Sequence, residues 1–352
     1  MNLYPHVSVV VPVYNREHMI GKCIQSLLDV DYPSYDIIVV DNGSTDRTLE
    51  IIRQYPVTLL QCKERGSYEA RNTGVKKATG EIIAFTDSDC VVEKKWLKAL
   101  IANYTHDSVG GVCGEIYSYK PEKVIEKFCD VIGVNSVKLI NRIDSRKCEL
   151  KKDPNRFLSA DLVTANCSVR KRVIEKIGGF DTDFKSGGDV GFGWSILKAG
   201  YKLIYEPEAI VLHKHRTSLW ALIRLFFKYG KDQPLLLKKH YDGRSYIRVK
   251  SYLWEQYEWG CRLPIPSLID IDFCTLLLLS VALIPFFSFF LFVSLGILLL
   301  ILIGTLREAL PLIRETHDLK WLVLFPFLHL VRNYSFITGR IYGGIRWSVI
   351  AC

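Results

Sequence analysis

The ten cysteines of this 352-residue chain include no C-x-x-C pair. Structural zinc sites and thiol–disulfide redox motifs usually need such pairs, so the spacing excludes these common motifs and offers no disulfide framework. Reduced, mostly buried thiols in a cytosolic compartment are therefore expected. The N-terminus likewise has no basic segment before its first apolar run, Val7 to Val11, and Pro12 cuts that run short. The sequence therefore predicts no secretory signal peptide.

The formal net charge of the chain is +9, and most of the basic excess lies in one stretch. Between Lys214 and Arg262, eleven lysines and arginines stand against four acids, directly before the most apolar part of the chain. Basic residues beside an apolar segment are attracted to anionic lipid headgroups and favour a cytoplasmic location. The pattern predicts an anionic membrane as a partner, and it argues against nucleic acid.

The first hundred residues alternate strand and helix signals. Four strand-like apolar runs lie at residues 7–13, 35–40, 57–61 and 81–86, with helical patterns between them. Such alternation with short connections predicts an α/β fold, in which a mostly parallel sheet carries helices on both faces. Ligands bind these sheets beyond the carboxyl ends of the strands. Polar clusters follow three of the runs and are expected to converge on one site: Tyr14-Asn15, Asp41-Asn42 and Asp87-Ser88-Asp89.

Asp-x-Asp triplets occur four times in the chain, where about one is expected by chance. The triplet alone is therefore weak evidence for a site. Only Asp87-Ser88-Asp89 closes a strand-like apolar run, Glu81 to Thr86. A buried strand that ends in two carboxylates can hold a divalent cation against a diphosphate. We expect a metal site at this strand end.

Residues 96 to about 216 follow a less regular pattern. It predicts four helices, at residues 93–104, 121–132, 169–177 and 192–199. A short strand is expected at residues 202–205. A further helix is expected at 217–229, where apolar residues such as Leu219 and Trp220 recur beside Arg224 and Lys228. A helix of this composition typically lies in the membrane interface.

Residues 273–303 carry no charged side chain. A single helix of that length would be about 46 Å long, well beyond the roughly 30 Å of bilayer hydrocarbon. Pro285 divides the run, so a tight hairpin of two short spans is expected, starting upstream near Pro266. A third apolar stretch, 319–341, contains arginines and a histidine and is expected to lie in the interface. Basic residues between the two stretches favour a cytoplasmic position for that loop.

Five segments resemble, in order and spacing, the motifs of family 2 glycosyltransferases with the GT-A fold. They are Val9–Asn15, Val39–Asp46, Ala70–Gly74, Gly80–Asp89 and Gly178–Asp181. The resemblance covers about residues 5–215. The apolar C-terminal part is similar in composition to that of family members that act on lipid-linked acceptors.

This resemblance implies a nucleotide diphosphate-sugar as the donor. Five residues are implied to hold it: Pro12, Tyr14, Asn15 and Asp41 at the base and ribose, and Arg71 at the diphosphate. From the sequence alone, Asp41 could instead cap the turn before its helix, and Arg71 could be a solvated ion-pair partner.

The resemblance further places Asp87 at the ribose or the metal, and Asp89 and His213 at the metal. The chemistry agrees with this assignment, because a hard cation such as Mg²⁺ or Mn²⁺ with oxygen ligands would neutralise a leaving diphosphate. On its own, His213 could equally be a residue at a strand end.

Asp189 is the candidate catalytic base, because it lies eleven residues before Gly200, where the family carries the second acid of a Glu-Asp pair. A base is needed to take the proton of the acceptor hydroxyl. Three neighbours depart from the family pattern: Gly188 and Gly191 replace acids, and Ser195 replaces an arginine. These departures indicate an altered acceptor. The Gln-x-x-Arg-Trp motif of processive synthases is absent, which favours transfer of a single sugar.

Together the patterns predict an inverting, metal-dependent glycosyltransferase of cell-surface glycan or glycolipid synthesis. It would use a lipid-linked or membrane-proximal acceptor at the cell membrane, with the catalytic domain facing the cytoplasm. The expected domains are the catalytic domain 1–216, a basic interface segment 217–262, and transmembrane or interfacial helices 263–352. Two alternatives stay open: a nucleotidyltransferase on a similar sheet, and a membrane scaffold that binds nucleotide-sugar without turnover.

Overall fold

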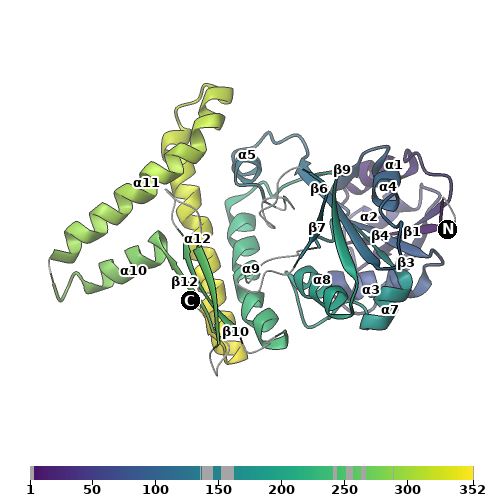
Figure 1. Ribbon diagram of the computed structural model, residues 1–352. Coiled ribbons are helices and arrows are strands. Elements are labelled where there is room, and N and C mark those ends of the chain that lie inside the picture. The colour runs from purple at the N-terminus through teal and green to yellow at the C-terminus, as the bar shows by residue number, and fades with distance from the viewer. Residues whose placement is uncertain are drawn as a thin grey trace. The chain divides into compact units, whose positions relative to one another are not determined.

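The computed structural model describes residues 4–134, 136, 146–151, 162–240, 244–250, 257–262, 267–287 and 289–351 (Figure 1). The chain divides into two compact units. The sheet unit comprises residues 1–121, 133–153 and 158–215, and the helical unit comprises residues 122–132, 154–157 and 216–352.

The sheet unit is built on one nine-stranded sheet whose first half is parallel. There β1 pairs with both β2 and β4, and β2 pairs with β3. These strands are β1 Val7–Val13, β2 Tyr35–Asp41, β3 Thr58–Gln61 and β4 Ile82–Thr86. β1 is buried along its whole length, as expected for a continuous β-branched run in a parallel strand. The parallel sheet predicted for the first hundred residues is confirmed.

The second half of the sheet is mixed. β8 (Asn166–Arg170) pairs antiparallel with β4 and β6 (Val109–Ser118), and β6 runs parallel to β9 (Lys202–His213). β5 (Cys90–Val92) and β7 (Cys148–Leu150) both pair antiparallel with β9. The sequence pattern predicts neither β6 nor β8. β6 contains three glycines, which weaken the strand signal, and its partners are distant in the sequence.

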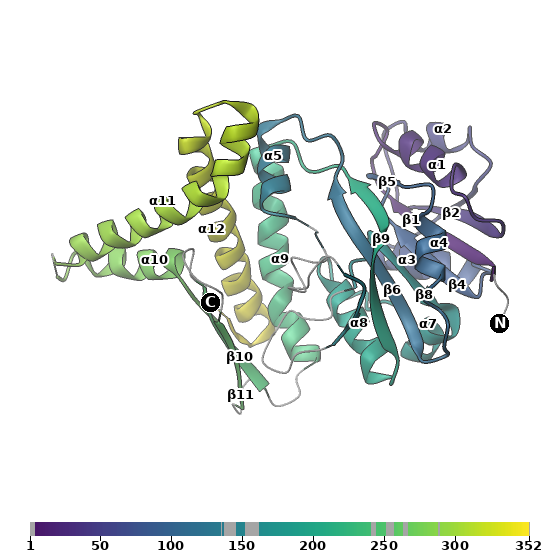
Figure 2. The same ribbon diagram turned by 45° about the horizontal axis from the view of Figure 1, so that its top comes forward.

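Helices of the sheet unit are α1 Ile20–Leu28, α2 Thr48–Ile52, α3 Ser67–Lys77, α4 Trp96–Ile101, α7 Lys171–Ile177 and α8 Gly188–Lys198 (Figure 2). α3 lies very close to the sheet, since a Cβ on Gly74 would be 2.4 Å from a methyl carbon of Val10.

Three predicted boundaries in this unit are wrong. The helix expected from residue 169 starts at Lys171, because Val169 belongs to β8 and pairs with Ile83. The helix expected from residue 192 already starts at Gly188, since the glycines of its first turns hide the helical pattern. The strand expected at 202–205 continues as β9 to His213.

The helical unit contains α5 (Val124–Val131), α9 (Leu219–Lys239) and α12 (Trp321–Trp347). α9 and α12 contact each other through their backbones at glycines. A Cβ on Gly230 would be 2.0 Å from the carbonyl oxygen of Phe336, and one on Gly339 would be 2.1 Å from that of Phe227. Buried Arg340 donates to Oε1 of Gln233 at 2.6 Å across this contact. α9 is much longer than the helix predicted at 217–229.

Two further helices of this unit, α10 (Phe273–Leu283) and α11 (Phe289–Thr316), pack against each other as a hairpin with Pro285 in its turn. The hairpin start proposed near Pro266 lies outside the described residues. Among the residues that the structure describes, α11 is the one helix long and apolar enough to cross a membrane, by length and composition. A small sheet of order β11-β10-β12-β13, which the sequence pattern does not predict, comprises Tyr257–Arg262, Arg244–Lys250, Ser267–Asp272 and Ile350–Ala351.

Candidate active site

The turns after β1 and β2 meet at the carboxyl edge of the sheet. Pro12 lies beyond the last β1–β4 pair, Val10 with Phe85, where a residue without an N–H is tolerated. Asn15 adopts a left-handed φ of 50° and accepts from the Thr45 N–H at 2.8 Å, while its own N–H donates to Ser44 Oγ at 3.0 Å. A non-glycine residue in this conformation often marks a functional site.

Asp41 closes the second turn. Its buried carboxylate accepts from the backbone N–H groups of Gly43 and Ser44 at 3.1 and 3.2 Å. This is the turn-capping role that the sequence left open beside nucleotide contact. Tyr14, by contrast, projects outward with 46% of its surface exposed, so its ring is free to stack on a ligand.

Arg71 on α3 is a buried cation, with only 3% of its surface exposed. Its guanidinium donates to Oδ1 of Asp87 at 2.5 Å and lies 5.6 Å from the ring centre of Tyr68 and 6.0 Å from that of Phe180. Its Nε is buried and has no hydrogen-bond partner among the residues that the structure describes. Arg71 is therefore not a solvated ion-pair residue, and its charge is held at the end of β4.

The Gly178–Asp181 motif places Phe180 beneath that guanidinium. Asn72 holds the Phe180 backbone from both sides, accepting from its N–H at 2.9 Å and donating to its carbonyl at 2.8 Å. The Phe180 ring stacks on Tyr68 and Phe192 with centroid distances of 5.8 and 3.9 Å. Sequence reasoning missed Tyr68, Asn72 and Phe180 as site residues, although Asn72 and Phe180 lie inside two of the recognised motifs.

Asp189 lies in the first turn of α8, partly buried near Arg71. Burial raises the pKa of Asp189, and the Asp87 charge adds to this. The Arg71 charge and the N–H groups of Asp189 and Thr164 partly offset the rise. A carboxylate whose pKa is raised is a stronger proton acceptor, which suits a general base.

Gly188 departs from the family pattern for a steric reason. Its N–H donates to the Tyr68 hydroxyl at 2.7 Å, and a Cβ there would lie 2.8 Å from the Tyr68 ring and 2.9 Å from Cβ of Phe184. Any side chain at this position would force Tyr68 or Phe184 to move. Tyr68 fills that space instead, and it contacts the backbone immediately before the candidate base.

A second group of polar side chains lies where β5 meets β9. The ligand atoms of Asp89, Cys90 and His213 lie within 4.8 Å of one another, and His213 Nε2 is 3.4 Å from Oδ1 of Asp89. The register of these strands places Cys90 opposite His213. Arg16, which sequence reasoning missed, lies with Nη2 3.2 Å from Oδ2 of Asp89.

The donor set in this group fits a divalent cation. Asp89 offers carboxylate oxygens, and His213 is buried with an Nδ1 for which the described part of the chain supplies no hydrogen-bond partner. Burial raises the pKa of the Cys90 thiol, and the charges of Asp89 and Asp87 raise it further, so the thiol stays protonated. Because a thiolate is the ligand form of cysteine, Asp89 and His213 are the better candidates.

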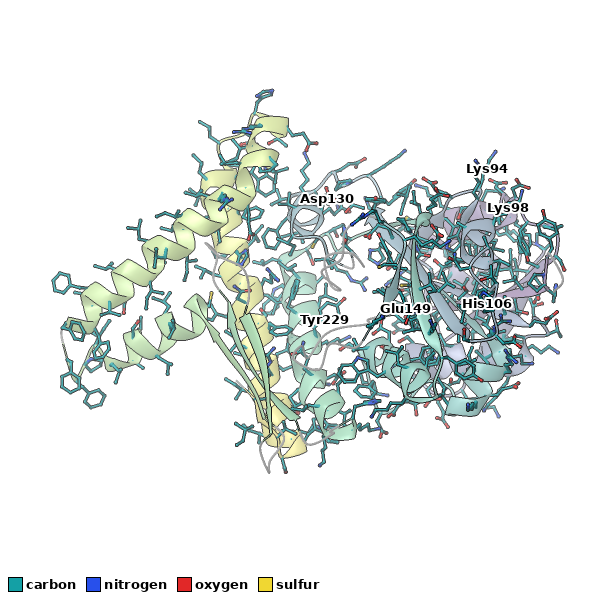
Figure 3. All side chains as sticks on the ribbon, in the orientation of Figure 1. Lys94, Lys98, His106, Asp130, Glu149 and Tyr229 are labelled. Atoms are coloured by element: carbon teal, nitrogen blue, oxygen red, sulfur yellow. The ribbon has the colours of Figure 1, made fainter. Side chains whose placement is uncertain are left out.

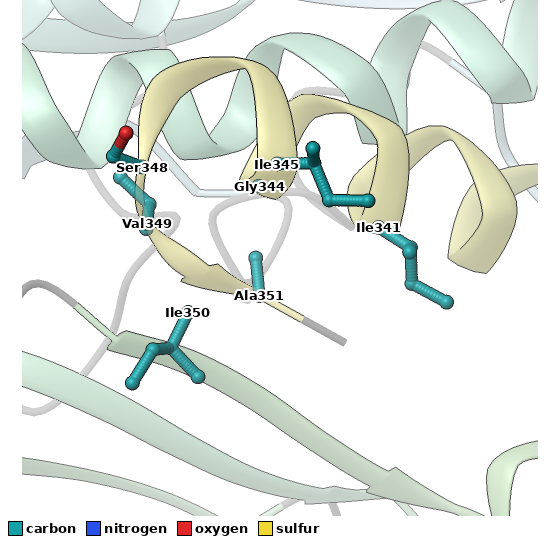
Figure 4. A pocket seen from close by; sticks show the side chains of 7 residues that line it. All are labelled: Ile341, Gly344, Ile345, Ser348, Val349, Ile350 and Ala351. Atoms are coloured by element: carbon teal, nitrogen blue, oxygen red, sulfur yellow. The ribbon is translucent and has the colours of Figure 1, made fainter.

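An apolar pocket in the helical unit does not have the chemistry of a nucleotide site. It has a volume of about 380 Å³ and lies at the end of α12, where residues such as Ile345 and Val349 line it (Figure 4). Apart from the Ser348 hydroxyl, its lining offers no polar side chain to a phosphate or a sugar.

The sequence shows where this arrangement belongs. Residues 8–178 match the family model described as glycosyl transferase family 2. The chain is 33% identical over 239 residues to glycosyltransferase AglE of Haloferax volcanii, an alignment that covers 65% of this chain and 73% of the relative. The chain belongs to glycosyltransferase family 2. It is thus an enzyme of the transferase class, as predicted.

Two other relatives of this family 2 glycosyltransferase differ in the share of their length that aligns with it. A dolichyl N-acetyl-α-D-glucosaminyl phosphate diacetamido-dideoxy-glucuronosyltransferase of Methanococcus voltae is 25% identical, over 96% of this chain and 98% of the relative. A pre-mycofactocin glycosyltransferase of Mycobacterium tuberculosis is 31% identical over 67% of this chain, which spans about half (48%) of that relative.

The fold has a solved counterpart. Mannosyltransferase PcManGT from Pyrobaculum calidifontis, in complex with GDP-Man and Mn²⁺, superposes with a TM-score of 0.51 at 22% identity, over 67% of this chain and 64% of that one. This likeness confirms the predicted α/β architecture of the GT-A type.

Replacing Arg71 by methionine should lower the free energy of unfolding by about 3 kcal/mol. The change removes one member of a buried ion pair, and the value is at the low end of the usual range because the Asp87 side chain is 32% exposed. Urea denaturation of the purified protein measures it. The matched control is Arg47→Met, which breaks an exposed pair with Glu50 and should cost less than about 1 kcal/mol. Equal losses in both variants would contradict the buried role.

Gly188→Ala should lower the melting temperature and slow turnover of the donor, because the new Cβ displaces the start of α8 from Tyr68. In a double-mutant cycle, Tyr68→Leu should relieve part of this effect, so the double variant should lose less than the sum of the single variants. Gly296→Ala, where nothing lies within 4 Å of the new Cβ, serves as the neutral control. Strict additivity of the two losses would rule out the contact as the cause.

Proposed function

We propose that this glycosyltransferase is metal-dependent and inverting, and that it transfers one sugar from a nucleotide-sugar to a lipid-linked or membrane-proximal acceptor. The observation that carries the proposal is the buried Arg71 cation, which is ion-paired to Asp87 and acts electrostatically on Asp189. Its charge lies beside the strand end proposed to hold the donor and also beside the proposed base. Direct displacement needs the donor on one side of the reacting carbon and the base on the other, and Arg71 lies beside both proposed groups.

In the proposed reaction, the acceptor hydroxyl attacks the anomeric carbon of the donor sugar as its proton passes to the Asp189 carboxylate. The bond from the anomeric carbon to the diphosphate oxygen breaks, and its electron pair leaves with the nucleoside diphosphate. Displacement from the opposite face inverts the configuration. The Arg71 charge favours the anionic form of Asp189, which is the form that takes the proton.

Donor binding is assigned to the turns at the carboxyl edge of the sheet. Tyr14 is exposed enough to stack on the base, and the two turns that contain Asn15 and Asp41 would hold the ribose. Asp89 and His213 would hold Mg²⁺ or Mn²⁺, a cation that neutralises charge on the diphosphate when bound. The Mn²⁺ in the PcManGT complex supports this reading of the donor set.

Two observations support a lipid-linked acceptor. The Methanococcus voltae relative, which aligns over nearly the whole chain, is named for a dolichyl phosphate-linked sugar. The helical unit of this chain also exposes many large apolar side chains, and Trp220 on α9 is a prominent one. We assign residues 1–216 to catalysis, 217–262 to the membrane interface and 263–352 to membrane attachment, with the catalytic domain at the cytoplasmic face.

Asp189→Asn should reduce sugar transfer by about 10²- to 10⁴-fold while nucleotide-sugar binding stays nearly unchanged. Thermal stability at neutral pH should not fall, because burial disfavours the ionised carboxylate that the change removes. In the wild type, activity should decline as the pH falls through the raised pKa of Asp189, since protonation removes the base. Asp29→Asn, an exposed aspartate on α1's C-terminal side, is the control. Full turnover in Asp189→Asn would refute the assignment.

Asp89→Ala and His213→Ala should each weaken Mn²⁺ binding, measured by the paramagnetic signal of free Mn²⁺ in the presence of a nucleoside diphosphate. Loss of these ligands removes half or more of the protein donors proposed for the cation. Cys90→Ala should bind Mn²⁺ like the wild type, because this hard cation prefers carboxylate and imidazole ligands to a thiol. An unchanged titration in Asp89→Ala would sink the proposed metal site.

A panel of nucleotide-sugars identifies the donor and separates the alternatives. The proposed enzyme should be stabilised against heat by one donor and should release its nucleoside diphosphate when an acceptor is added. A scaffold would be stabilised without release, and a nucleotidyltransferase would instead form a nucleotide-sugar from a nucleoside triphosphate and a sugar phosphate.

A further inference from the structure

The hairpin of α10 and α11 exposes an unusual amount of apolar surface. Its turn and the adjoining helix ends carry exposed aromatic rings, and Phe286 and Phe292 have 75% and 73% of their surfaces exposed. Between the start of α10 and Ile303 of α11, the exposed large apolar residues are Leu279, Val281, Leu283, Phe286, Phe287, Phe289, Leu291, Phe292, Leu295, Leu299 and Ile303. Monomeric proteins rarely leave a continuous patch of this kind in water. Sticks drawn on the hairpin end are mainly carbon (Figure 3).

The hairpin has a packed base and a free end. At the base, Cys274 of α10, Ile301 of α11 and Ile337 of α12 form a buried cluster. Asn333 of α12 adds a hydrogen bond to Sγ of Cys274 at 3.3 Å. Toward the turn, the exposed residues named above replace this packing, so the free end is covered by none of the described helices.

Polar groups inside the free end satisfy one another. The Ser280 hydroxyl donates to the carbonyl of Leu277 at 3.0 Å. The one hydrogen of the Ser294 hydroxyl has two acceptors within reach, Ser280 Oγ across the two helices at 2.9 Å and the carbonyl of Phe290 at 2.8 Å. The helices satisfy their own backbone groups. Polar groups in bilayer hydrocarbon must find hydrogen-bond partners within the protein, whereas polar groups in water can bond to the solvent.

The free end has the length of one leaflet. From Ile301 at the base to Phe289 at the turn, α11 rises about 18 Å, at 1.5 Å per residue. α10 has 11 residues, or about 16 Å. The hydrocarbon of a bilayer is about 30 Å thick, so each leaflet contributes about 15 Å. Neither α10 nor the free part of α11, from Phe289 to Ile301, reaches across.

Charged residues flank the apolar part of both helices of the hairpin, in each case at the end away from the turn. Asp270 and Asp272 directly precede α10, and Arg307 and Glu308 follow the apolar part of α11. Beyond them, α11 packs again, with Ala309 and Leu312 buried. Most of the exposed large apolar side chains of α11 lie between Phe289 and Ile301, and its charged residues begin only at Arg307.

We propose that the α10–α11 hairpin enters one leaflet of the membrane and returns to the same side without crossing. Its occupant is the hydrocarbon of that leaflet, with the phenylalanines of the turn near the bilayer midplane, the packed base around Cys274 and Ile301 near the headgroups, and Arg307 beyond them in water. α12, which buries Arg340 and His329 among its neighbours, takes no part in crossing. This inference goes beyond the proposed function, which requires only a membrane-proximal acceptor and holds for either topology. It also replaces the two short spans expected from the sequence.

Cysteine labelling in proteoliposomes tests the proposal on the full-length protein. Phe286→Cys probes the turn and Arg307→Cys the base, both in a background with Cys62, Cys148, Cys261 and Cys352 changed to serine, while the six cysteines that the structure buries remain. Glu315→Cys, exposed on the packed half of α11, is the control for a site in water. The reagents are a charged, membrane-impermeant maleimide, added outside or trapped inside the vesicles, and a lipid-soluble maleimide.

We expect Phe286→Cys to react with the lipid-soluble reagent and with the impermeant one from neither side. Arg307→Cys and Glu315→Cys should react with the impermeant reagent from one and the same side. Labelling of Phe286→Cys from the side opposite to Arg307→Cys would establish a spanning hairpin, and labelling from the same side would place the turn in water. Either result overturns the proposal, as does failure of the lipid-soluble reagent to label Phe286→Cys.

Discussion

The buried charge of Arg71 is the constraint around which the sheet unit's site is organised. A guanidinium with almost no exposure to water needs a carboxylate and polarisable neighbours, and Asp87, Tyr68 and Phe180 supply them. Each of these requirements explains a sequence motif. The double glycine and Asn72 place Phe180, and Gly188 leaves room for Tyr68. The same cation then biases the proton affinity of Asp189, so packing and chemistry share one interaction.

The parallel half of the sheet could be predicted because its information is local. β1, β2 and β4 are continuous apolar runs, and each is followed by polar residues that mark its carboxyl end. The antiparallel half depends on pairing between distant segments, such as β6 with β8 and β9, and its glycines give no periodic signal. α8 was placed too late for the same reason, since helical spacing cannot be seen through Gly188, Gly191 and Gly193.

The candidate site shows the same division. Residues within motifs contact one another at the strand ends, as parallel topology requires: Asn15 after β1 bonds to the turn that Asp41 begins, and Arg71 bonds to Asp87 after β4. Arg16 and Tyr68 were missed because their importance comes from partners far along the chain, Asp89 and Gly188. Sequence spacing also could not show that Cys90 faces His213, which follows only from the register of β5 on β9.

The glycine contact between α9 and α12 has a consequence for the order in which the protein forms. Gln233 and Arg340 are separated by 107 residues, and Lys238 reaches the carbonyl of Trp347. During synthesis, α9 therefore leaves the ribosome long before α12, the helix that covers it. The face of α9 that packs on α12 stays uncovered while α10 and α11 are being made. The helical unit can close only after almost the whole chain has been synthesised, whereas the parallel strands of the sheet unit find their partners early.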